Sequence, residues 1–392
     1  MKRTGVIEAC ASELDDLLAE APSEAAERMR AVGHAINGGP CVLYGAGELG
    51  LTVLHKLRAI GIEPVSFADD TPEKQGRIIE GLPVMTPQAA AARFGANAVF
   101  IVTILNPRLN FVTARARIEQ LTENRVFSFL HMAWRHPGEF LPYYQFEPPE
   151  LMLSKQRDIR DAFDLFEDEE SRQQFIAHVR FRLHLDHAEL PPADHGNYFP
   201  TDIGMRLSDR VVFVDCGAFD GDTIRLFLAQ QGEGFGAIYA FEPDKRNFDK
   251  LSSYVEGLAG NIVQKIHLFN AGVGEERSKL RFNSAGNMSS SVNNSGDAEI
   301  DIFPIQDVVR ADGGPVYLKF DVEGAESEAL AGCEKFFKDS QTMFAISVYH
   351  RPDDLWQLPL YVASKTKDYR FYLRTQGEDG MDVICYALPP GD

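Results

Sequence analysis

Acidic residues follow the apolar runs in the second half of the chain, and they are the side chains best suited to chemistry. Asp215, Glu242 and Asp321 each lie at the end of a short apolar run of the kind that forms a buried strand, and His350 follows another. In a parallel sheet the carboxyl ends of the strands meet at one edge, where ligands bind. We therefore expect these four side chains to surround one ligand site.

The stretch VVFVDCGAFDGDTIRLFL combines a strand, a glycine loop and the start of a helix. Loops of this outline often hold a pyrophosphate at the helix N-terminus, but Asp215, Asp220 and Asp222 would repel a phosphate here. These carboxylates would attract a ligand that has an adenosine and a positive centre but no phosphate. S-adenosylmethionine is such a ligand, because it carries a sulfonium and an ammonium group. Gly217 and Gly221 would let the backbone approach such a ligand closely.

Two side chains are candidates for the base that takes a proton at this edge. His350 has an ordinary pKa near 6.5, which suits a base at neutral pH; Asp321 is the competitor, and the two roles could be exchanged. Lys319 lies two residues before Asp321, on the same sheet face, where it could pair with Asp321 and keep it ionised. Glu242 could accept hydrogen bonds from both ribose hydroxyls.

A metal ion is the alternative explanation for the sequence DVEGAE. Asp321, Glu323 and Glu326 could hold Mg²⁺ with water molecules. Acidic residues before a helix also favour its N-terminal dipole, so we expect no metal here. His184 and His187 have helical spacing without a nearby cysteine, and we interpret them as an exposed helix face, or a lid over the acceptor, rather than a zinc site.

The elements that position these residues alternate between strands and helices. Residues 210–392 contain seven expected strands, the last two close together around GEDG as in a hairpin. This pattern predicts an α/β fold, a doubly wound seven-stranded sheet with an antiparallel last strand. Residues 1–130 predict a smaller Rossmann-like α/β domain, and residues 131–209 a helical linker segment.

The first domain has a glycine loop of its own. GAGELG, with Gly45, Gly47 and Gly50, follows a strand and opens a helix, and Asp69 and Asp70 follow about 20 residues later, as acids that bind a ribose do. Taken alone this pattern indicates NAD. The following stretch DDTPEKQGRIIEGLPVMTP resembles the N-terminal domains of sugar acyltransferases, which implies a nucleotide or nucleotide-linked sugar instead.

Residues from about 200 to 390 resemble the FkbM family of S-adenosylmethionine-dependent methyltransferases, through FVDCGAFDGDT, YAFEPD, FNAGVG, KFDVEGAESEALAG and ISVYH. The resemblance implies a class I methyltransferase-type fold and transfer of a methyl group to a hydroxyl of a sugar, glycoconjugate or natural-product precursor. It implies catalytic roles for His350 and Asp321, and contact with the acceptor for Ser289, Ser290 and Glu323. The implied cofactor-binding residues are Asp215, Gly217, Ala218, Phe219, Gly221, Asp222, Thr223, Glu242, Pro243, Ala271, Gly272 and Asp321.

Composition limits the partners and the compartment. A net charge of −19 argues against nucleic acid and against an anionic membrane surface. There is no apolar run of about 18 residues and no signal-like N-terminus, so we expect no membrane insertion and a cytoplasmic location. A small-molecule or glycoconjugate acceptor is the expected partner, with a homodimer left open. The alternatives to an O-methyltransferase are an NAD-dependent oxidoreductase using GAGELG and a non-catalytic binding module.

Overall fold

The chain was analysed as a computed structural model, which describes residues 2–36, 38–104, 109–194, 198–283, 291–292, 298–311 and 313–390. It forms two compact units that interleave along the sequence. Unit 1 comprises Met1–Gln156, Gln173–Ala193 and Gly377–Met381, and unit 2 comprises Arg157–Arg172, Asp194–Gln376 and Asp382–Asp392. Residues 131–209 thus contribute to both units, and the domain boundaries expected at residues 130 and 209 stay a prediction.

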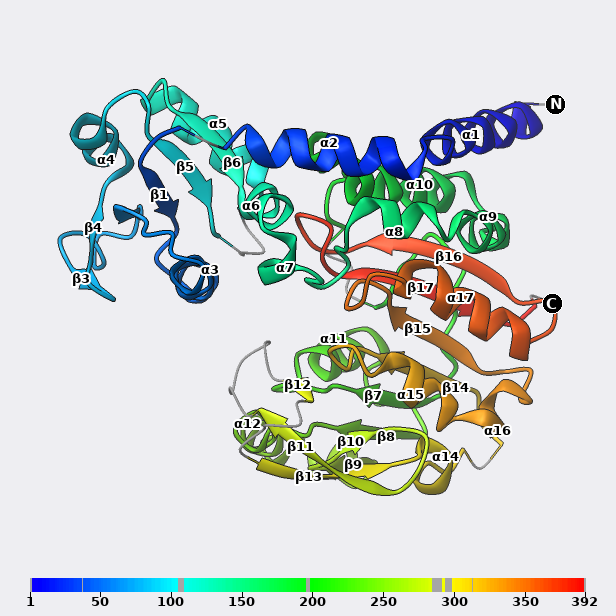
Figure 1. The fold of residues 1–392 in the computed structure, drawn as a ribbon. Coiled ribbons are helices and arrows are strands. Elements are labelled where there is room, and N and C mark those ends of the chain that lie inside the picture. The colour runs from blue at the N-terminus through cyan, green and yellow to red at the C-terminus, as the bar shows by residue number, and fades with distance from the viewer. Residues whose placement is uncertain are drawn as a thin grey trace. The chain divides into compact units, whose positions relative to one another are not determined.

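Unit 1 is built on a sheet whose described strands have the order β3-β4-β2-β1-β5-β6. All pair in parallel except the short edge strand β3. The sheet has helices on both faces, as Figure 1 shows. Successive residues of a strand point to opposite faces, and the apolar residues on each face pack into a separate cluster with the helices there. The strands are β1 (Cys41–Tyr44), β2 (Ser66–Ala68), β3 (Ile78–Ile79), β4 (Leu82–Met85), β5 (Val99–Val102) and β6 (Arg125–Ser128).

The apolar faces of four helices cover the unit 1 sheet. Leu54 and Leu57 of α3 (Glu48–Ala59) pack with Met132 of α6 (Phe129–Arg135) against one face. Ala90 of α4 (Pro87–Phe94) and Ile118 of α5 (Phe111–Leu121) pack against the other. Further helices are α1 (Lys2–Leu18), α2 (Pro22–His34), α7 (Pro137–Phe140), α8 (Pro149–Leu153) and the 3₁₀ helix η1 (His187–Glu189), while α10 (Glu169–His184) has residues in both units.

Unit 2 contains the larger sheet, with seven strands in the described residues and the order β16-β17-β15-β14-β7-β8-β9. Strands β15, β14, β7, β8 and β9 pair in parallel, and β17 lies antiparallel between β15 and β16. The predicted fold class is therefore confirmed. The strands are β7 (Val212–Cys216), β8 (Ala237–Phe241), β9 (Ile266–Phe269), β14 (Val316–Phe320), β15 (Met343–Ser347), β16 (Arg370–Thr375) and β17 (Val383–Leu388).

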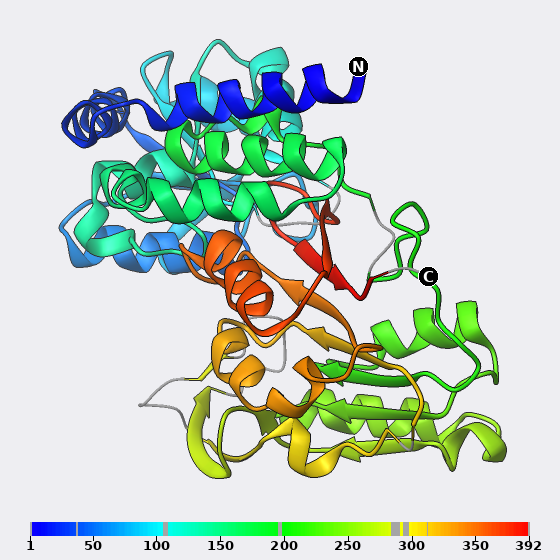
Figure 2. The same ribbon diagram turned by 90° about the vertical axis from the view of Figure 1, so that its right-hand side faces the viewer.

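Helices cover both faces of the unit 2 sheet (Figure 2), and this explains why its central strands are buried throughout. All residues of β7, β14 and β15 are buried. Phe227 of α11 and Leu251 of α12 pack with Phe213 of β7 in one apolar cluster. The helices are α9 (Gln156–Leu165), α11 (Asp222–Gln231), α12 (Lys245–Glu256), α13 (Gly260–Val263), α14 (Ile305–Val308), α15 (Glu326–Ala331), α16 (Glu334–Phe337) and α17 (Asp354–Lys365).

A small additional sheet in unit 2 was not expected from the sequence. The run KIHLFNAGV has the pattern of one strand, but it divides into β9 and β10 (Gly272–Val273), which belong to different sheets. Strand β10 pairs with β13 (Ala298–Phe303), which pairs in turn with β11 (Ser278–Asn283), and β11 pairs with β12 (Ser291–Val292). A continuous apolar run does not show in the sequence that the chain leaves one sheet and pairs in another partway along it.

A buried arginine joins two segments of unit 2 that are distant in sequence. Arg374 is 2% exposed in its side chain, and its Nη2 lies 2.7 Å from Oδ2 of Asp168. Its Nε donates to Oδ2 of Asp202 at 2.8 Å, and its Nη1 donates to Oγ of Ser171 at 2.9 Å. Removing one partner of a buried ion pair leaves the others with unsatisfied polar groups.

We expect Arg374→Met to lower the free energy of unfolding by about 2 kcal/mol, less than for a fully buried pair because both carboxylates are partly exposed. Urea denaturation would measure this, with exposed Lys367→Met as the matched control. A loss no larger than that of the control would contradict the stabilising role of this cluster.

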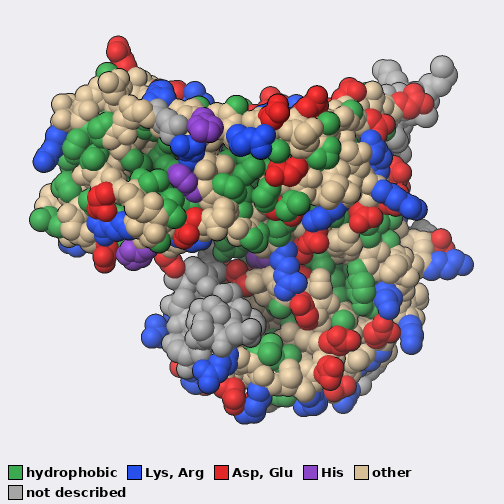
Figure 3. Space-filling view, viewed as in Figure 1, with side chains coloured by type: hydrophobic (Ala, Val, Ile, Leu, Met, Phe, Trp, Pro, Cys, Tyr) green, Lys and Arg blue, Asp and Glu red, His purple; other side chains and the backbone are tan. Residues whose placement is uncertain are grey.

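The surface shows no segregation of charge on the face in Figure 3, where Lys and Arg side chains lie among Asp and Glu side chains. Among the helices of the described chain, none combines the length and the apolar character that crossing a membrane requires.

Candidate functional site

The predicted site residues of unit 2 converge at the carboxyl edge of its parallel strands. Strands β7 and β14 are neighbours with Asp215 opposite Lys319, and Asp321 directly follows β14. His350 follows β15, the next strand on the other side of β14. The crossing connections between these strands thus bring together residues that are up to 135 positions apart in the sequence (350 − 215 = 135).

A buried lysine holds the glycine loop in place. Nζ of Lys319 lies 2.9 Å from Oδ1 of Asp215 and donates to the carbonyl oxygen of Gly217 at 2.6 Å. Asp321 lies farther away, with Oδ2 at 3.9 Å. The pairing predicted between Lys319 and Asp321 is therefore secondary, because adjacent parallel strands put Lys319 directly beside Asp215.

The carboxylate of Asp215 is inaccessible in this conformation, with 0% of the residue exposed. Burial raises the pKa of Asp215 to about 6, although Lys319 opposes this shift. Burial lowers the pKa of Lys319, but Asp215, Asp321 and Asp222 raise it more strongly, so the lysine stays charged. Asp215 therefore acts on the loop through Lys319, and its predicted contact with a cofactor stays a prediction.

The two loop glycines are required by the chain itself. Gly217 has a φ of +84°, and a Cβ there would lie 1.9 Å from the carbonyl oxygen of Asp321. Gly221 has a φ of +89°, and a Cβ would lie 2.9 Å from the ring of Tyr254. The sequence predicted that these glycines let the backbone come close to a ligand. In the structure they let it come close to atoms of the protein itself.

Glu242 ties the glycine loop to the next strand. Its Oε2 accepts the N–H of Phe219 at 2.9 Å and its Oε1 accepts the N–H of Asp244 at 2.8 Å. Burial raises the pKa of Glu242 to about 7, and these two backbone donors lower it. Each oxygen keeps a second lone pair, so the carboxylate can still accept the two hydroxyls of a ribose.

The remaining predicted cofactor residues differ in their surroundings. Ala218 and Ala271 are buried, Thr223 is 3% exposed, and Asp222 is exposed at the start of α11. Pro243 follows Glu242 in the turn before α12. Gly272 belongs to β10, where a Cβ would meet Ile302 at 2.7 Å, so its small size serves the additional sheet. Ser289 and Ser290 lie outside the described residues.

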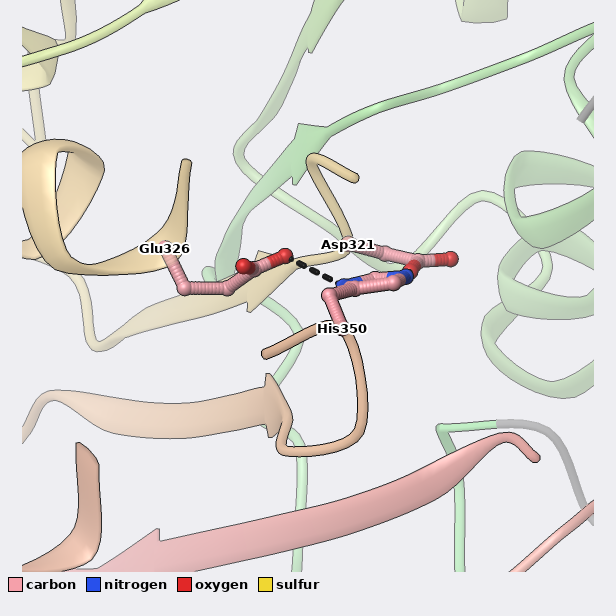
Figure 4. A group of neighbouring side chains, drawn as sticks. All are labelled: Asp321, Glu326 and His350. Carbon is pink, nitrogen blue, oxygen red and sulfur yellow. Dashed lines mark hydrogen bonds and ion pairs between the residues drawn. The ribbon is translucent and has the colours of Figure 1, made fainter. Parts of the chain in front are cut away.

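His350 lies among carboxylates (Figure 4). Its Nδ1 is 2.8 Å from Oε1 of Glu326 in a buried hydrogen bond, and its Nε2 is 3.5 Å from Oδ1 of Asp321 and 3.8 Å from Oε2 of Glu323. Burial lowers the pKa of His350, but Glu326, Asp321 and Glu323 raise it more, to about 10. An imidazole that already carries its proton at neutral pH does not accept another, so the predicted role of His350 as the base does not fit this arrangement.

Asp321 lies between a hydroxyl group and two cations. Its Oδ2 accepts the hydroxyl of Tyr198 at 2.9 Å, and Lys319 and His350 flank it. Burial raises the pKa of Asp321, but Lys319, His350 and the hydroxyl groups of Tyr198 and Ser347 lower it below its usual value. Asp321 is therefore a fixed anion, suited to facing a positive ligand.

Sequence reasoning missed two residues of this network. Tyr198 lies in residues 131–209, which were predicted only as a helical linker segment. It has a φ of +67°, and Nζ of Lys319 lies 5.0 Å from the centre of its ring. Glu326 was considered only as a metal ligand or a helix-capping acid. A weak signal for Glu326 was its position at the start of α15 beside the strand end, whereas nothing in the sequence around Tyr198 indicates its partner.

Three of these side chains also have the proximity of metal ligands. Within the described chain, Asp321, Glu326 and His350 offer ligand atoms that all lie within 4.8 Å of one another. However, Oε1 of Glu326 accepts the N–H of Val322 at 2.9 Å as well as bonding to His350. These contacts form an ion-pair network among the described side chains, and the expectation of no metal stays a prediction.

His350 makes the stability of unit 2 depend on pH. Its pKa is about 10 in the folded chain and about 6.5 when unfolded, so its contribution is complete below about pH 6.5 and is lost as pH rises through 10. We expect the free energy of unfolding to decline over this range, and His350→Gln to make the decline shallower. Urea titrations at several pH values would measure it, with exposed His267→Gln as control; identical slopes in wild type and His350→Gln would disprove the assignment.

The glycine loop of unit 1 is also organised by its own acids. Oδ2 of Asp69 accepts the N–H of Ala46 at 2.8 Å and lies 3.0 Å from Nζ of Lys74. Asp70 accepts the hydroxyl of Tyr44 and pairs with Arg117 at 2.8 Å. The acids expected to bind a ribose therefore have partners within the chain, which weakens the motif's indication of NAD.

The three glycines of this loop have different surroundings. A Cβ at Gly45 would lie 2.7 Å from the carbonyl oxygen of Thr103, and a Cβ at Gly50 would lie 2.0 Å from the carbonyl oxygen of Gly45. A Cβ at Gly47 would meet none of the described atoms within 4 Å. Gly45 and Gly50 are thus explained by packing, whereas Gly47, at the start of α3, has no such explanation among the residues that the structure describes.

Comparison with known proteins finds similarities in both sequence and fold. Residues 215–379 match the model of the methyltransferase FkbM domain. The crystal structure of a methyltransferase FkbM from Methylobacillus flagellatus KT is similar over 98% of this chain and 99% of that chain, with a TM-score of 0.74 and 21% identity. This likeness shows a shared fold along almost the whole chain. No curated protein matches significantly.

Two further solved structures are similar at a lower level. One is a putative rRNA-methylase from Clostridium thermocellum, with a TM-score of 0.32, 10% identity, and coverage of 47% of this chain and 90% of that chain. The other is a SAM-dependent methyltransferase from Aquifex aeolicus, with a TM-score of 0.29, 12% identity, and coverage of 51% and 94%.

Proposed function

We propose, from the match of residues 215–379 to the model of the methyltransferase FkbM domain, that the chain transfers the methyl group of S-adenosylmethionine to a hydroxyl group of a sugar or glycoconjugate precursor. The proposal rests mainly on one observation, that a buried lysine connects the glycine loop after β7 with the acid that follows β14. Lys319 bonds to the glycine loop through Asp215 and Gly217, and lies 3.9 Å from Asp321 at the next strand end.

The electrostatics of the site favour a cationic cofactor. Asp321, Glu323, Glu326 and Asp382 surround the single imidazolium of His350. A sulfonium placed at this edge would gain favourable interactions with the fixed carboxylate of Asp321, whereas a pyrophosphate would be repelled. Glu242 is the residue positioned to accept the ribose hydroxyls, since both its oxygens keep a free lone pair.

Binding of the cofactor is the first test of this function. We expect S-adenosylmethionine and S-adenosylhomocysteine to bind in calorimetry and NAD not to bind. Glu242→Gln should weaken both by about 10–100-fold, because hydrogen bonds to a charged group contribute about 1.5–3 kcal/mol. Exposed Glu256→Gln on α12 is the matched control. Binding of NAD but of neither adenosyl ligand would overturn the proposal in favour of an oxidoreductase.

For unit 1 we propose a nucleotide or nucleotide-linked sugar as the ligand of the Gly45–Gly50 loop. The support is Gly47, where an added Cβ would meet no described atom within 4 Å, at a position where a ligand would approach the first turn of α3. Gly47→Val should preserve folding and abolish binding of a uridine diphosphate sugar probe, with Gly138→Val, also in open space, as control. Equal binding by both variants would refute the assignment.

A further inference from the structure

Methyl transfer to an alcohol requires a group that removes the hydroxyl proton, and three side chains at the edge after β14 and β15 are near enough to one another to compete for that role. His350 is held between Glu326, Asp321 and Glu323 and keeps its own proton. Asp321 is fixed by the hydroxyl of Tyr198 and flanked by Lys319 and His350. Donors that stabilise a carboxylate make it a poor proton acceptor, which leaves the third side chain, Glu323.

Glu323 is less constrained by partners than Asp321. Its Oε2 lies 3.8 Å from Nε2 of His350, which is beyond hydrogen-bond distance, and its side chain is 28% exposed. It can therefore meet an acceptor hydroxyl directly. The side chain of Asp321 is equally exposed, at 27%, but its Oδ2 already accepts the hydroxyl of Tyr198 at 2.9 Å.

The backbone at Glu323 is unusual for a residue with a side chain. Its φ is +53°, and Gly324 follows with a φ of +94°, so two consecutive residues are left-handed. Glycine adopts this region without cost, whereas other residues do so at a cost in free energy. A glutamate at such a position indicates that its carboxylate is needed where this conformation places it.

We infer that Glu323 is the catalytic base of the methyl transfer, an assignment that rests on the proposed function. In the step, the hydroxyl oxygen attacks the methyl carbon while its proton passes to the carboxylate of Glu323. The carbon–sulfur bond breaks and its electron pair stays on sulfur. The products are the methyl ether, S-adenosylhomocysteine and a neutral Glu323, so the positive charge of the sulfonium and the negative charge of the carboxylate disappear together.

The charged groups around Glu323 agree with this role. Burial raises the pKa of Glu323, His350 lowers it, and Asp321, Glu326 and Asp382 raise it, giving a value of about 8. Arg351, the other nearby cation, approaches Gly324 and pairs with Glu328 at 3.4 Å. A base whose pKa is close to the working pH is the most effective, and an arriving sulfonium would lower the pKa of Glu323 and ionise it.

This leads to a test that needs no acceptor. Calorimetry near pH 7.5 in buffers of different ionisation enthalpy counts the protons released on binding. S-adenosylmethionine should release about half a proton more than S-adenosylhomocysteine, which lacks the sulfonium charge. Ionisation of Glu242, at the ribose position, would affect both ligands equally. Glu323→Gln should abolish the difference, and the exposed Glu256→Gln on α12 should preserve it.

The outcomes separate the two proposals. If wild type binds neither adenosyl ligand, the proposed function itself fails. If both bind and the difference in protons is absent, or persists in Glu323→Gln, Glu323 does not face the transferred methyl and this inference is wrong. Circular dichroism of Glu323→Gln and the conservative Glu323→Asp shows whether the fold is kept.

Kinetics provide a second measurement once screening has supplied an alcohol acceptor. Glu323→Gln should lower kcat by about 10²–10⁴-fold with an unchanged Kd for S-adenosylmethionine, and Glu323→Asp should retain part of the activity. The pH profile of wild type should rise as Glu323 ionises, and this limb should be missing in Glu323→Gln. A rise in KM with an unchanged kcat would show a binding role and overturn the assignment.

Discussion

Replacing Lys319 by methionine is expected to lower the free energy of unfolding by about 3–5 kcal/mol, the range for breaking a buried ion pair by removing one partner. Lys319 is 1% exposed and Asp215 is 0% exposed. Without Nζ, the carboxylate of Asp215 loses its counter-charge at 2.9 Å, and the carbonyl oxygen of Gly217 loses its donor at 2.6 Å. Urea denaturation of wild type and Lys319→Met measures the loss.

The double variant Lys319→Met with Asp215→Asn is the control for this prediction. Removing the charge of Asp215 should recover much of the stability, because the uncompensated carboxylate is the main source of the cost. Calorimetry should also show weaker binding of S-adenosylmethionine by the single variant, since the loop loses its attachment to β14. A single variant as stable as wild type, or a double variant less stable than the single, would contradict the proposed ion pair.

Replacing Gly217 by alanine is expected to weaken binding of S-adenosylmethionine by more than about 100-fold. The new Cβ would lie 1.9 Å from the carbonyl oxygen of Asp321, so the glycine loop and the acid after β14 would have to separate. A positive φ of +84° adds the strain of a left-handed alanine. The glycine loop and the acid after β14 would both be displaced from the binding site. We therefore expect the loss in binding free energy to exceed the loss in the free energy of unfolding.

Gly232→Ala separates strain from steric contact. Gly232 has a φ of +60°, and a Cβ there would meet nothing within 4 Å. This variant should lose a little stability, on the order of 1 kcal/mol, and keep its affinity for the cofactor. If Gly217→Ala also kept its affinity, the contact with Asp321 would not hold the site together.

The sequence alone identified the features that depend on neighbouring residues. Apolar runs ending in acids predicted the parallel strands and placed Asp215, Glu242, Asp321 and His350 at one edge. The hairpin around GEDG predicted the antiparallel last strand, which β17 forms. These predictions succeed because strand periodicity and turn residues are local properties of the chain.

The roles of those residues were decided by the tertiary structure. Lys319 was expected to pair with Asp321, but the register of β14 and β7 places it beside Asp215. His350 was expected to be the base, but Glu326 at 2.8 Å keeps it protonated. A pKa depends on burial and on charges within a few ångströms, and those neighbours come from strands and helices far apart in the sequence. The sequence therefore determined which groups meet at this edge, and only the folded chain determined which of them carry a proton.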